Sequence, residues 1–213
     1  MHGGPNGELT DFNRPKDFIW KLTHQQILKL NLGEGEKVTT LEEVLMLTLD
    51  ASKMLINIEI KSPADPGHYA AYEMAQFDLC KQVRNLIDML QINERTIVSS
   101  FHPGPTALFV KLRNQRWFER DFAIFQIFNG GGQSAPTEYK TPVGMQGILV
   151  RQSFFTQDMI ENTRKCGKKL GVWYGKSDKT ESQDTYDYLF GETGRRVDYF
   201  YSNFPVRAMK ARD

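Results

Sequence analysis

Polar side chains stand where the apolar runs of this sequence end, the place where parallel α/β proteins hold their reactive groups. Glu59 and Lys61 end one such run, and Ser100 and His102 end another. A carboxylate can bind a metal ion, a lysine can offset the charge of an anion, and an imidazole can exchange protons near neutral pH. The full set of such residues is His2, Glu59, Lys61, Ser99, Ser100, His102, Gln126, Arg151, Trp173, Lys176, Ser202 and Asn203.

Glu59 is the most informative of these residues. It lies inside the apolar segment Ile56-Asn57-Ile58-Glu59-Ile60-Lys61, where a buried carboxylate is costly unless a cation neutralises it. Lys61 lies two residues later and therefore on the same face of a strand. The pattern leaves two hypotheses open, a metal ligand at Glu59 or a buried structural ion pair between Glu59 and Lys61.

The histidines and tryptophans carry weaker signals. His2 precedes Gly3 and Gly4, which suits a tight turn or the close approach of a ligand, although a histidine near a chain end is usually solvated. His102 follows a predicted strand, and contact with a ligand is the minority hypothesis for it. Trp173 also ends a strand, where an indole serves either as packing or as a wall for a substrate headgroup.

Hydrophobic periodicity predicts the elements that position these side chains. Short apolar runs alternate with amphipathic segments, which is typical of an α/β fold with parallel strands. The loop at 129–143 is rich in Gly, Pro, Ser and Thr, and its length favours a lid or an insertion. We predict strands at 54–61, 96–101, 122–128, 147–155, 171–174 and 197–201, and helices at 39–49, 69–90, 106–114, 156–166 and 182–190.

Composition predicts one folded domain that spans residues 1–213. The chain has 27 basic and 26 acidic side chains, a net charge of +1, and 40% hydrophobic residues. This balance and the lack of a Lys/Arg run argue against a nucleic-acid partner. No apolar run approaches the roughly 20 residues of a membrane span, and no secretory signal is visible, so we expect a cytoplasmic location. The two cysteines, Cys80 and Cys166, have no metal-site spacing and are expected to be reduced thiols.

Taken together, the motifs resemble the glycerophosphodiester phosphodiesterase family. They occur in the family's order and cover nearly the whole chain, and the segment from Asn57 to Lys61 is the most specific of them. The matching stretches are His2-Gly3-Gly4 with Asn6-Gly7-Glu8-Leu9, Thr40-Leu41-Glu42-Glu43-Val44-Leu45, Asn57-Ile58-Glu59-Ile60-Lys61, Ser99-Ser100-Phe101, Gly171-Val172-Trp173, and Val197-Asp198 with Phe204-Pro205.

The resemblance implies a (β/α)₈ barrel and a metal-dependent hydrolysis of glycerophosphodiesters to sn-glycerol 3-phosphate and an alcohol, as part of lipid metabolism. It implies that His2 exchanges a proton with the attacking or leaving oxygen, that Glu59 binds a divalent ion (Mg²⁺ or Ca²⁺), and that Lys61 steadies the phosphoryl oxygens. In this family the substrate's own hydroxyl attacks phosphorus, so no protein nucleophile is needed. Trp173, Ser100 and His102 are the expected contacts to the small-molecule substrate.

Departures from the family pattern concern the first two strands. The family's His-Arg motif and its Glu-x-Asp motif are absent, so the resemblance implies a barrel that lacks about the first two βα units, with an incomplete amino terminus. Counting a strand at His2 gives seven candidates, one more than such a barrel holds. Three smaller departures are Gly3 in place of an aspartate, Lys176 in place of a polar residue such as Asn, and Ser202-Asn203 in place of Thr-Asp.

Three hypotheses about function follow from these matches and departures. The first is an active phosphodiesterase whose recorded chain lacks its first part. The second is a catalytically incomplete relative that binds a headgroup or a partner protein without turnover. The third, which the segment from Asn57 to Lys61 disfavours, is another metal-using barrel enzyme that acts on sugars or nucleotides.

Overall fold

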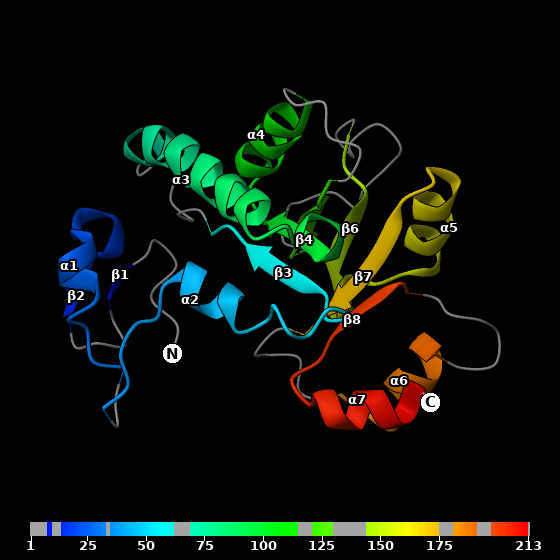
Figure 1. The fold of residues 1–213 in the computed structure, drawn as a ribbon. Helices are drawn as coiled ribbons and strands as arrows, with labels where there is room; N and C mark the ends of the chain where they lie inside the picture. Colours follow the sequence, from blue (N-terminus) through cyan, green and yellow to red (C-terminus); the bar gives the residue numbers. More distant parts are fainter. Residues whose placement is uncertain are drawn as a thin grey trace.

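A parallel sheet of six strands forms the centre of the molecule in a computed structural model (Figure 1). The structure describes residues 8–9, 14–32, 35–61, 69–114, 121–129, 144–174, 181–190 and 197–212. The strands follow one another in chain order across the sheet, and each pairs with the next. They are β3 (Ile56–Glu59), β4 (Thr96–Ser100), β5 (Ala123–Phe128), β6 (Gly147–Arg151), β7 (Lys169–Trp173) and β8 (Tyr199–Tyr201).

Helices connect the strands and cover one face of the sheet, which gives a half-barrel of α/β type. In Figure 1, α3 and α4 lie side by side over β3 to β5, and α5 lies beside β7. The helices are α2 (Leu41–Met46), α3 (Tyr69–Met89), α4 (Pro103–Asn114), α5 (Gln157–Lys165), α6 (Gln183–Phe190) and α7 (Pro205–Arg212). Three short 3₁₀ helices accompany them at Ile19–Lys21, Asn93–Arg95 and Gln152–Phe154.

The segment before α2 forms a small unit beside the sheet (Figure 1). Its strands β1 (Glu8–Leu9) and β2 (Arg14–Phe18) pair antiparallel, and the short helix α1 (His24–Ile27) follows. Thr23 caps α1 with a reciprocal capping box to Gln26. The sequence pattern did not predict this unit, because each of its elements is too short to show a hydrophobic period.

The two faces of the sheet bury different side chains. On the outer face, Ile58, Val98 and Ile124 pack against α3 and α4. On the opposite, inner face, a separate cluster includes Phe125 and Leu149. Because side chains alternate along a strand, the inner face also receives Glu59, Ser99, Arg151, Trp173 and Tyr201.

All six predicted strands are present in the sheet, although their ends differ. The predicted strand 147–155 stops at Arg151, where a 3₁₀ helix begins. Helix α4 begins at Pro103, three residues before its predicted start, because proline is well suited to the first turn of a helix. Helix α7 was not predicted. The seventh candidate, at His2, lies outside the described residues, as does the predicted loop beyond Asn129, so the expectation that one candidate is not a barrel strand stays a prediction.

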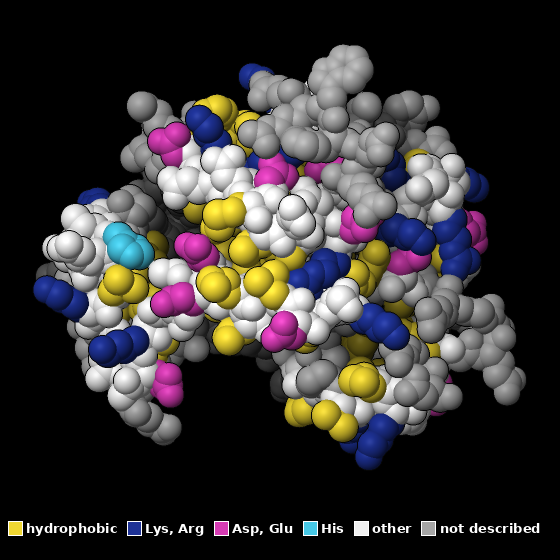
Figure 2. Space-filling model, in the orientation of Figure 1, with side chains coloured by type: hydrophobic (Ala, Val, Ile, Leu, Met, Phe, Trp, Pro, Cys, Tyr) yellow, Lys and Arg dark blue, Asp and Glu magenta, His cyan; other side chains and the backbone are white. Residues whose placement is uncertain are grey.

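Helix α2 is shorter than predicted, and its apolar side is largely uncovered. The prediction placed Leu41, Val44, Leu45 and Leu49 on one packed face, but only Leu45 is fully buried. Figure 2 shows hydrophobic side chains gathered over α2 and β3. The exposed ones are Val44, Met46, Leu47, Leu49, Met54 and Leu55. This exposure arises at an edge of the described sheet, where β3 pairs with β4 on one side.

Candidate functional site

Glu59 lies at the carboxyl end of β3 on the inner face, and its side chain is exposed. The expectation of a buried carboxylate was wrong, and with it the hypothesis of a buried Glu59–Lys61 ion pair. The physical reason is that β3 is an edge strand of the described sheet, so its inner face is open to solvent. Lys61, two residues beyond on the same side, is exposed as well. Both groups are therefore accessible to a ligand.

Hydrogen bonds between neighbouring strands hold the backbone beneath Glu59. The Ser99 hydroxyl donates to Asn57 Oδ1 at 3.0 Å, and the Ile60 amide donates to the Ser99 carbonyl at 2.7 Å. In the parallel register Asn57 pairs with Ile97 and Ser99 pairs with Glu59, so the bond between Ser99 and Asn57 runs diagonally between β3 and β4. The Asn57 side chain in the family-like segment thus aligns β3 with β4 and contributes to the position of Glu59.

Ser100 is fully buried and faces the helices rather than the inner face. Its hydroxyl donates to the Ile60 carbonyl at 2.6 Å and accepts from the His102 amide at 3.2 Å. These bonds tie the loop after β4 to the end of β3. The structure therefore places Ser100 below the rim, as a support for the backbone, and its direct contact with a substrate stays a prediction.

His102 is half-buried in the loop after β4, and its ring orientation is set by the backbone. The Gly104 amide donates to His102 Nδ1 at 3.1 Å, so in the neutral ring the proton resides on Nε2. A Cβ at position 104 would lie 3.0 Å from Nδ1 and 3.3 Å from Gln76 Oε1. Glycine at this position thus permits the close approach that fixes the imidazole.

Gln126 organises the same loop from β5, although the sequence prediction gave it no role. It is buried, its Oε1 accepts from Thr106 Oγ1 at 2.8 Å, and its Nε2 donates to the carbonyls of Ser100 and Phe101 at 2.9 and 3.0 Å. The sequence does contain a sign of this role, namely a single amide side chain within the apolar run of β5. A buried polar group of this kind must find hydrogen-bond partners.

Trp173 ends β7 on the inner face and contacts side chains from two other strands. Phe101 meets its ring edge to face, with centroids 5.5 Å apart, and the Arg151 guanidinium carbon lies 6.0 Å from its ring centroid. The indole Nε1 is buried without a hydrogen-bond partner within the described part of the chain. Trp173 thus lies between an aromatic ring and a cation at the carboxyl end of the sheet, and its role as a wall for a substrate stays a prediction.

A second cluster was missed in the sequence and surrounds the buried carboxylate of Glu181, just before α6. Tyr186 Oη donates to Glu181 Oε2 at 2.9 Å, the Ser202 hydroxyl donates to the same oxygen, and the Asn203 amide donates to Oε1 at 2.5 Å. The hydrogen bond and burial together raise the pKa of the Tyr186 hydroxyl, burial being the larger cause. Glu181 thus anchors the carboxyl end of β8 to α6.

Two predicted residues cannot be compared with this geometry, since His2 and Lys176 lie outside the described residues. Within the described ranges, no three His, Cys, Asp or Glu side chains lie close enough together to hold a metal ion. Glu59 therefore belongs to no group of three such side chains among these residues.

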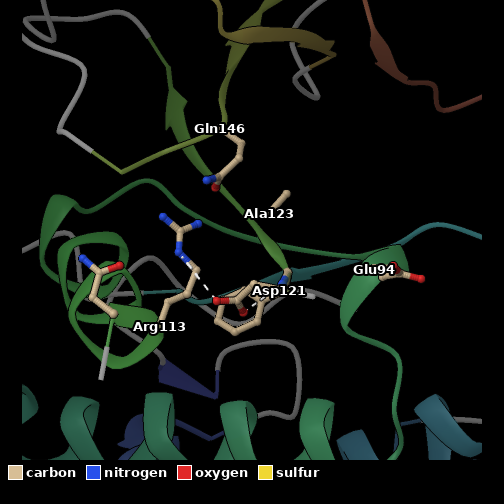
Figure 3. A pocket seen from close by; sticks show the side chains of 7 residues that line it. Glu94, Arg113, Asp121, Ala123 and Gln146 are labelled. Carbon is tan, nitrogen blue, oxygen red and sulfur yellow. Dashed lines mark hydrogen bonds and ion pairs between the residues drawn. The ribbon is translucent and has the colours of Figure 1, made fainter. Parts of the chain in front are cut away.

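A cavity of about 390 Å³ lies at the opposite end of the strands (Figure 3). It is lined by Arg113 and Asp121, whose Nε and Oδ2 atoms are 3.7 Å apart, and by Gln146 near the start of β6. Burial raises the pKa of the Asp121 carboxyl, against the opposing effect of the nearby guanidinium groups. This end of a parallel barrel supports stability rather than catalysis, so we do not assign the cavity to the site.

Comparison with known proteins connects this geometry to a family. The chain is 40% identical over 75 residues to a glycerophosphodiester phosphodiesterase of Bacillus altitudinis. The resemblance to glycerophosphodiester phosphodiesterases is confirmed. The matched segment covers 35% of this chain and 27% of the length of that relative. No protein-family model matches the chain.

Solved structures of phosphodiesterases share the fold of this chain. A candidate glycerophosphodiester phosphodiesterase of Galdieria sulphuraria superposes with a TM-score of 0.76 at 21% identity. The superposition covers 99% of this chain and 78% of the Galdieria chain. A Parabacteroides distasonis glycerophosphodiester phosphodiesterase gives 0.66 at 18% identity, over 92% and 71%. An Oleispira antarctica phosphodiesterase, solved with its product sn-glycerol 3-phosphate, gives 0.69 at 14% identity, over 97% and 76%. At these identities the likeness shows the fold.

Membrane insertion finds no support in the helices that the structure describes. None of them combines the length and the apolar character that a bilayer crossing requires.

Proposed function

We propose that this protein is a glycerophosphodiester phosphodiesterase that releases sn-glycerol 3-phosphate and an alcohol, with a role in lipid metabolism. The observation that carries the proposal is the exposed pair of Glu59 and Lys61 at the carboxyl end of β3, within the segment most typical of the family. The named relative and the product bound in the Oleispira structure support the same substrate class. A (β/α)₈ barrel that lacks about its first two βα units is part of the proposal, and the fold shared with the solved phosphodiesterase structures supports it.

The chain's own residues supply charge and proton transfer in this proposal. A phosphodiester is anionic and resists attack, so the Lys61 ammonium offsets charge on the phosphoryl oxygens as it builds up. His2 exchanges a proton with the attacking or the leaving oxygen. Trp173 and the His102 loop border the substrate on the inner face, while Ser100 holds that loop in place.

The proposal includes a bound divalent ion, Mg²⁺ or Ca²⁺. Such an ion would act as a Lewis acid on the phosphoryl group. It normally takes six or more oxygen ligands, and several of them come from protein groups. The described residues alone do not fit this need, since Glu59 is one carboxylate without two neighbours of its kind. Glu59 would therefore be one ligand of the ion.

Turnover of glycerophosphocholine by the 213-residue chain tests the proposal, with sn-glycerol 3-phosphate as the measured product. We expect Glu59→Ala and His2→Ala each to lower turnover at least about a hundredfold, the scale of a lost acid–base group or ligand. Glu42→Ala is the matched control, because Glu42 is an exposed acid on α2 away from the inner face. Near-normal turnover in either site variant would contradict its assignment.

Calorimetry with MgCl₂ and CaCl₂ tests the ion separately. We expect binding heat that disappears in Glu59→Ala and persists in Glu42→Ala. Binding of sn-glycerol 3-phosphate without turnover or ion binding would instead favour the non-catalytic hypothesis.

A further inference from the structure

Arg151 occupies a position at the rim that the proposed function leaves unexplained. It is the last residue of β6. Its neighbours Ile148 and Val150 pack on the outer face with α5, whereas Leu149 belongs to the inner cluster. The alternation along the strand therefore directs Arg151 to the inner face, at the same end as Glu59.

The guanidinium of Arg151 is oriented by two neighbours. Its carbon lies 6.0 Å from the centroid of the Trp173 ring, and its Nη1 donates to Asn129 Oδ1 at 3.5 Å. Phe101 in turn braces the Trp173 ring from β4. A guanidinium over an aromatic ring is attracted by the electron density of the ring, whereas its five N–H donors point outward in its own plane. The contact with Trp173 is therefore compatible with binding an anion.

The chemistry of the proposed substrate calls for such a group. A phosphodiester presents two oxygens that share a negative charge, and the planar fork of an arginine matches this geometry with two parallel hydrogen bonds. Lys61 approaches the rim from β3 and acts as a point charge, while Arg151 approaches from β6, with β4 and β5 between them. The two cations thus border the inner face from separate strands.

We propose that Arg151, beside the Trp173 ring, binds the phosphate group of the substrate and of the product. This inference rests on the proposed function, because it assigns a phosphate ligand to the same site. It predicts that Arg151 acts mainly on binding, so its loss raises KM more than it lowers kcat. It also predicts that lysine substitutes only in part, because an ammonium lacks the planar fork.

Titration of the 213-residue chain with sn-glycerol 3-phosphate, together with glycerophosphocholine kinetics, tests this assignment. In Arg151→Gln we expect at least a tenfold rise in the Kd for sn-glycerol 3-phosphate and a similar rise in KM. Arg151→Lys retains the positive charge and replaces the glutamine variant if that variant is unstable. In it we expect an intermediate loss of affinity for sn-glycerol 3-phosphate. Arg164→Gln is the matched control, since Arg164 is an exposed arginine on the outer helix α5.

Tryptophan fluorescence gives a readout that a purely structural role would not move. Product binding should change the emission of the wild-type protein, and the change should be absent in Trp173→Phe and reduced in Arg151→Gln. If the wild-type protein binds the product and both Arg151 variants bind it equally well, Arg151 is not the phosphate ligand and the proposed function stands. If the wild-type protein neither binds the product nor hydrolyses the diester, the proposed function fails and this assignment fails with it.

Discussion

Side chains at the rim are positioned chiefly by bonds to the backbone. His102 is held through Gly104, and the carbonyls of the same loop are held through Gln126. The bonds of Gln126 join residues 20 or more positions apart in the chain. The sequence therefore indicates which side chains carry chemistry but not how they are oriented. A glutamine in an apolar strand indicates that partners exist without indicating which ones.

The cysteines give a prediction at the residue scale. Cys80 is completely buried on α3, and burial raises the pKa of its thiol to about 12, whereas Cys166 is half-buried at the end of α5. We expect iodoacetamide at pH 8 to modify Cys166 in the native protein and Cys80 only after denaturation, because the thiolate is the nucleophile. Peptide mass spectrometry checks this, and equal native labelling of both would contradict it.

The raised pKa of Cys80 also makes the free energy of unfolding depend on pH. The folded state favours the neutral thiol, so its contribution is fully present below the ordinary thiol pKa of 9.0. We expect that contribution to be lost as the pH rises from there toward the folded pKa of about 12.

At the scale of elements, local sequence signals were strongest where they do not depend on distant contacts. The helix predicted from residue 39 begins at Leu41, with Thr40 as its N-cap: Thr40 Oγ1 accepts from the Glu43 amide at 3.2 Å, and Glu43 Oε2 accepts from the Thr40 amide at 2.8 Å. Its predicted end was wrong, because the end depends on which apolar side chains find a partner. Leu49 does not extend the buried face.

Removal of the Thr40 cap tests this element. We expect Thr40→Ala to lower the free energy of unfolding by about 1 kcal/mol, the usual value for an N-cap. The neighbouring exposed Thr39, changed to alanine, should have no such effect. Urea unfolding measures both variants, and equal effects would show that the cap does not stabilise α2.

The same cap predicts a dependence on pH. The Thr40 amide, and to a lesser degree its hydroxyl, lower the pKa of Glu43 below 4.5. The contribution of Glu43 is therefore present above pH 4.5 and is lost as the pH falls through the folded pKa. We expect this acid dependence to be weaker in Thr40→Ala.

At the scale of the whole molecule, the inner face is filled by large side chains set beside small ones. Gly171 on β7 lies between Leu149 on β6 and Tyr199 on β8, and an added Cβ would overlap Leu149 Cδ2 and lie 3.2 Å from Tyr199 Cβ. Leu149 is 2% exposed, so its side chain has little room to move. Glycine at this position is thus a packing requirement of three strands together.

Overpacking at Gly171 provides the test at this scale. We expect Gly171→Ala to lower the free energy of unfolding by about 1–3 kcal/mol, the usual range for an enlarged core side chain. Leu149→Val removes the atom that would collide. The double variant should therefore lose less stability than the sum of the two single variants. Additive losses in urea unfolding would contradict the predicted contact.

The amino-acid pattern alone predicts the α/β class, the six strands, the starts of several helices and the residues that resemble the family's motif. These features depend on short-range periodicity and on caps, which are encoded within a few neighbouring residues. The exposure of Glu59 and the orientation of Ser100 toward the helices become visible in the folded arrangement. The contact between Arg151 and the Trp173 ring becomes visible there as well. Burial and contact between strands depend on which segments lie side by side, and no local pattern contains that information.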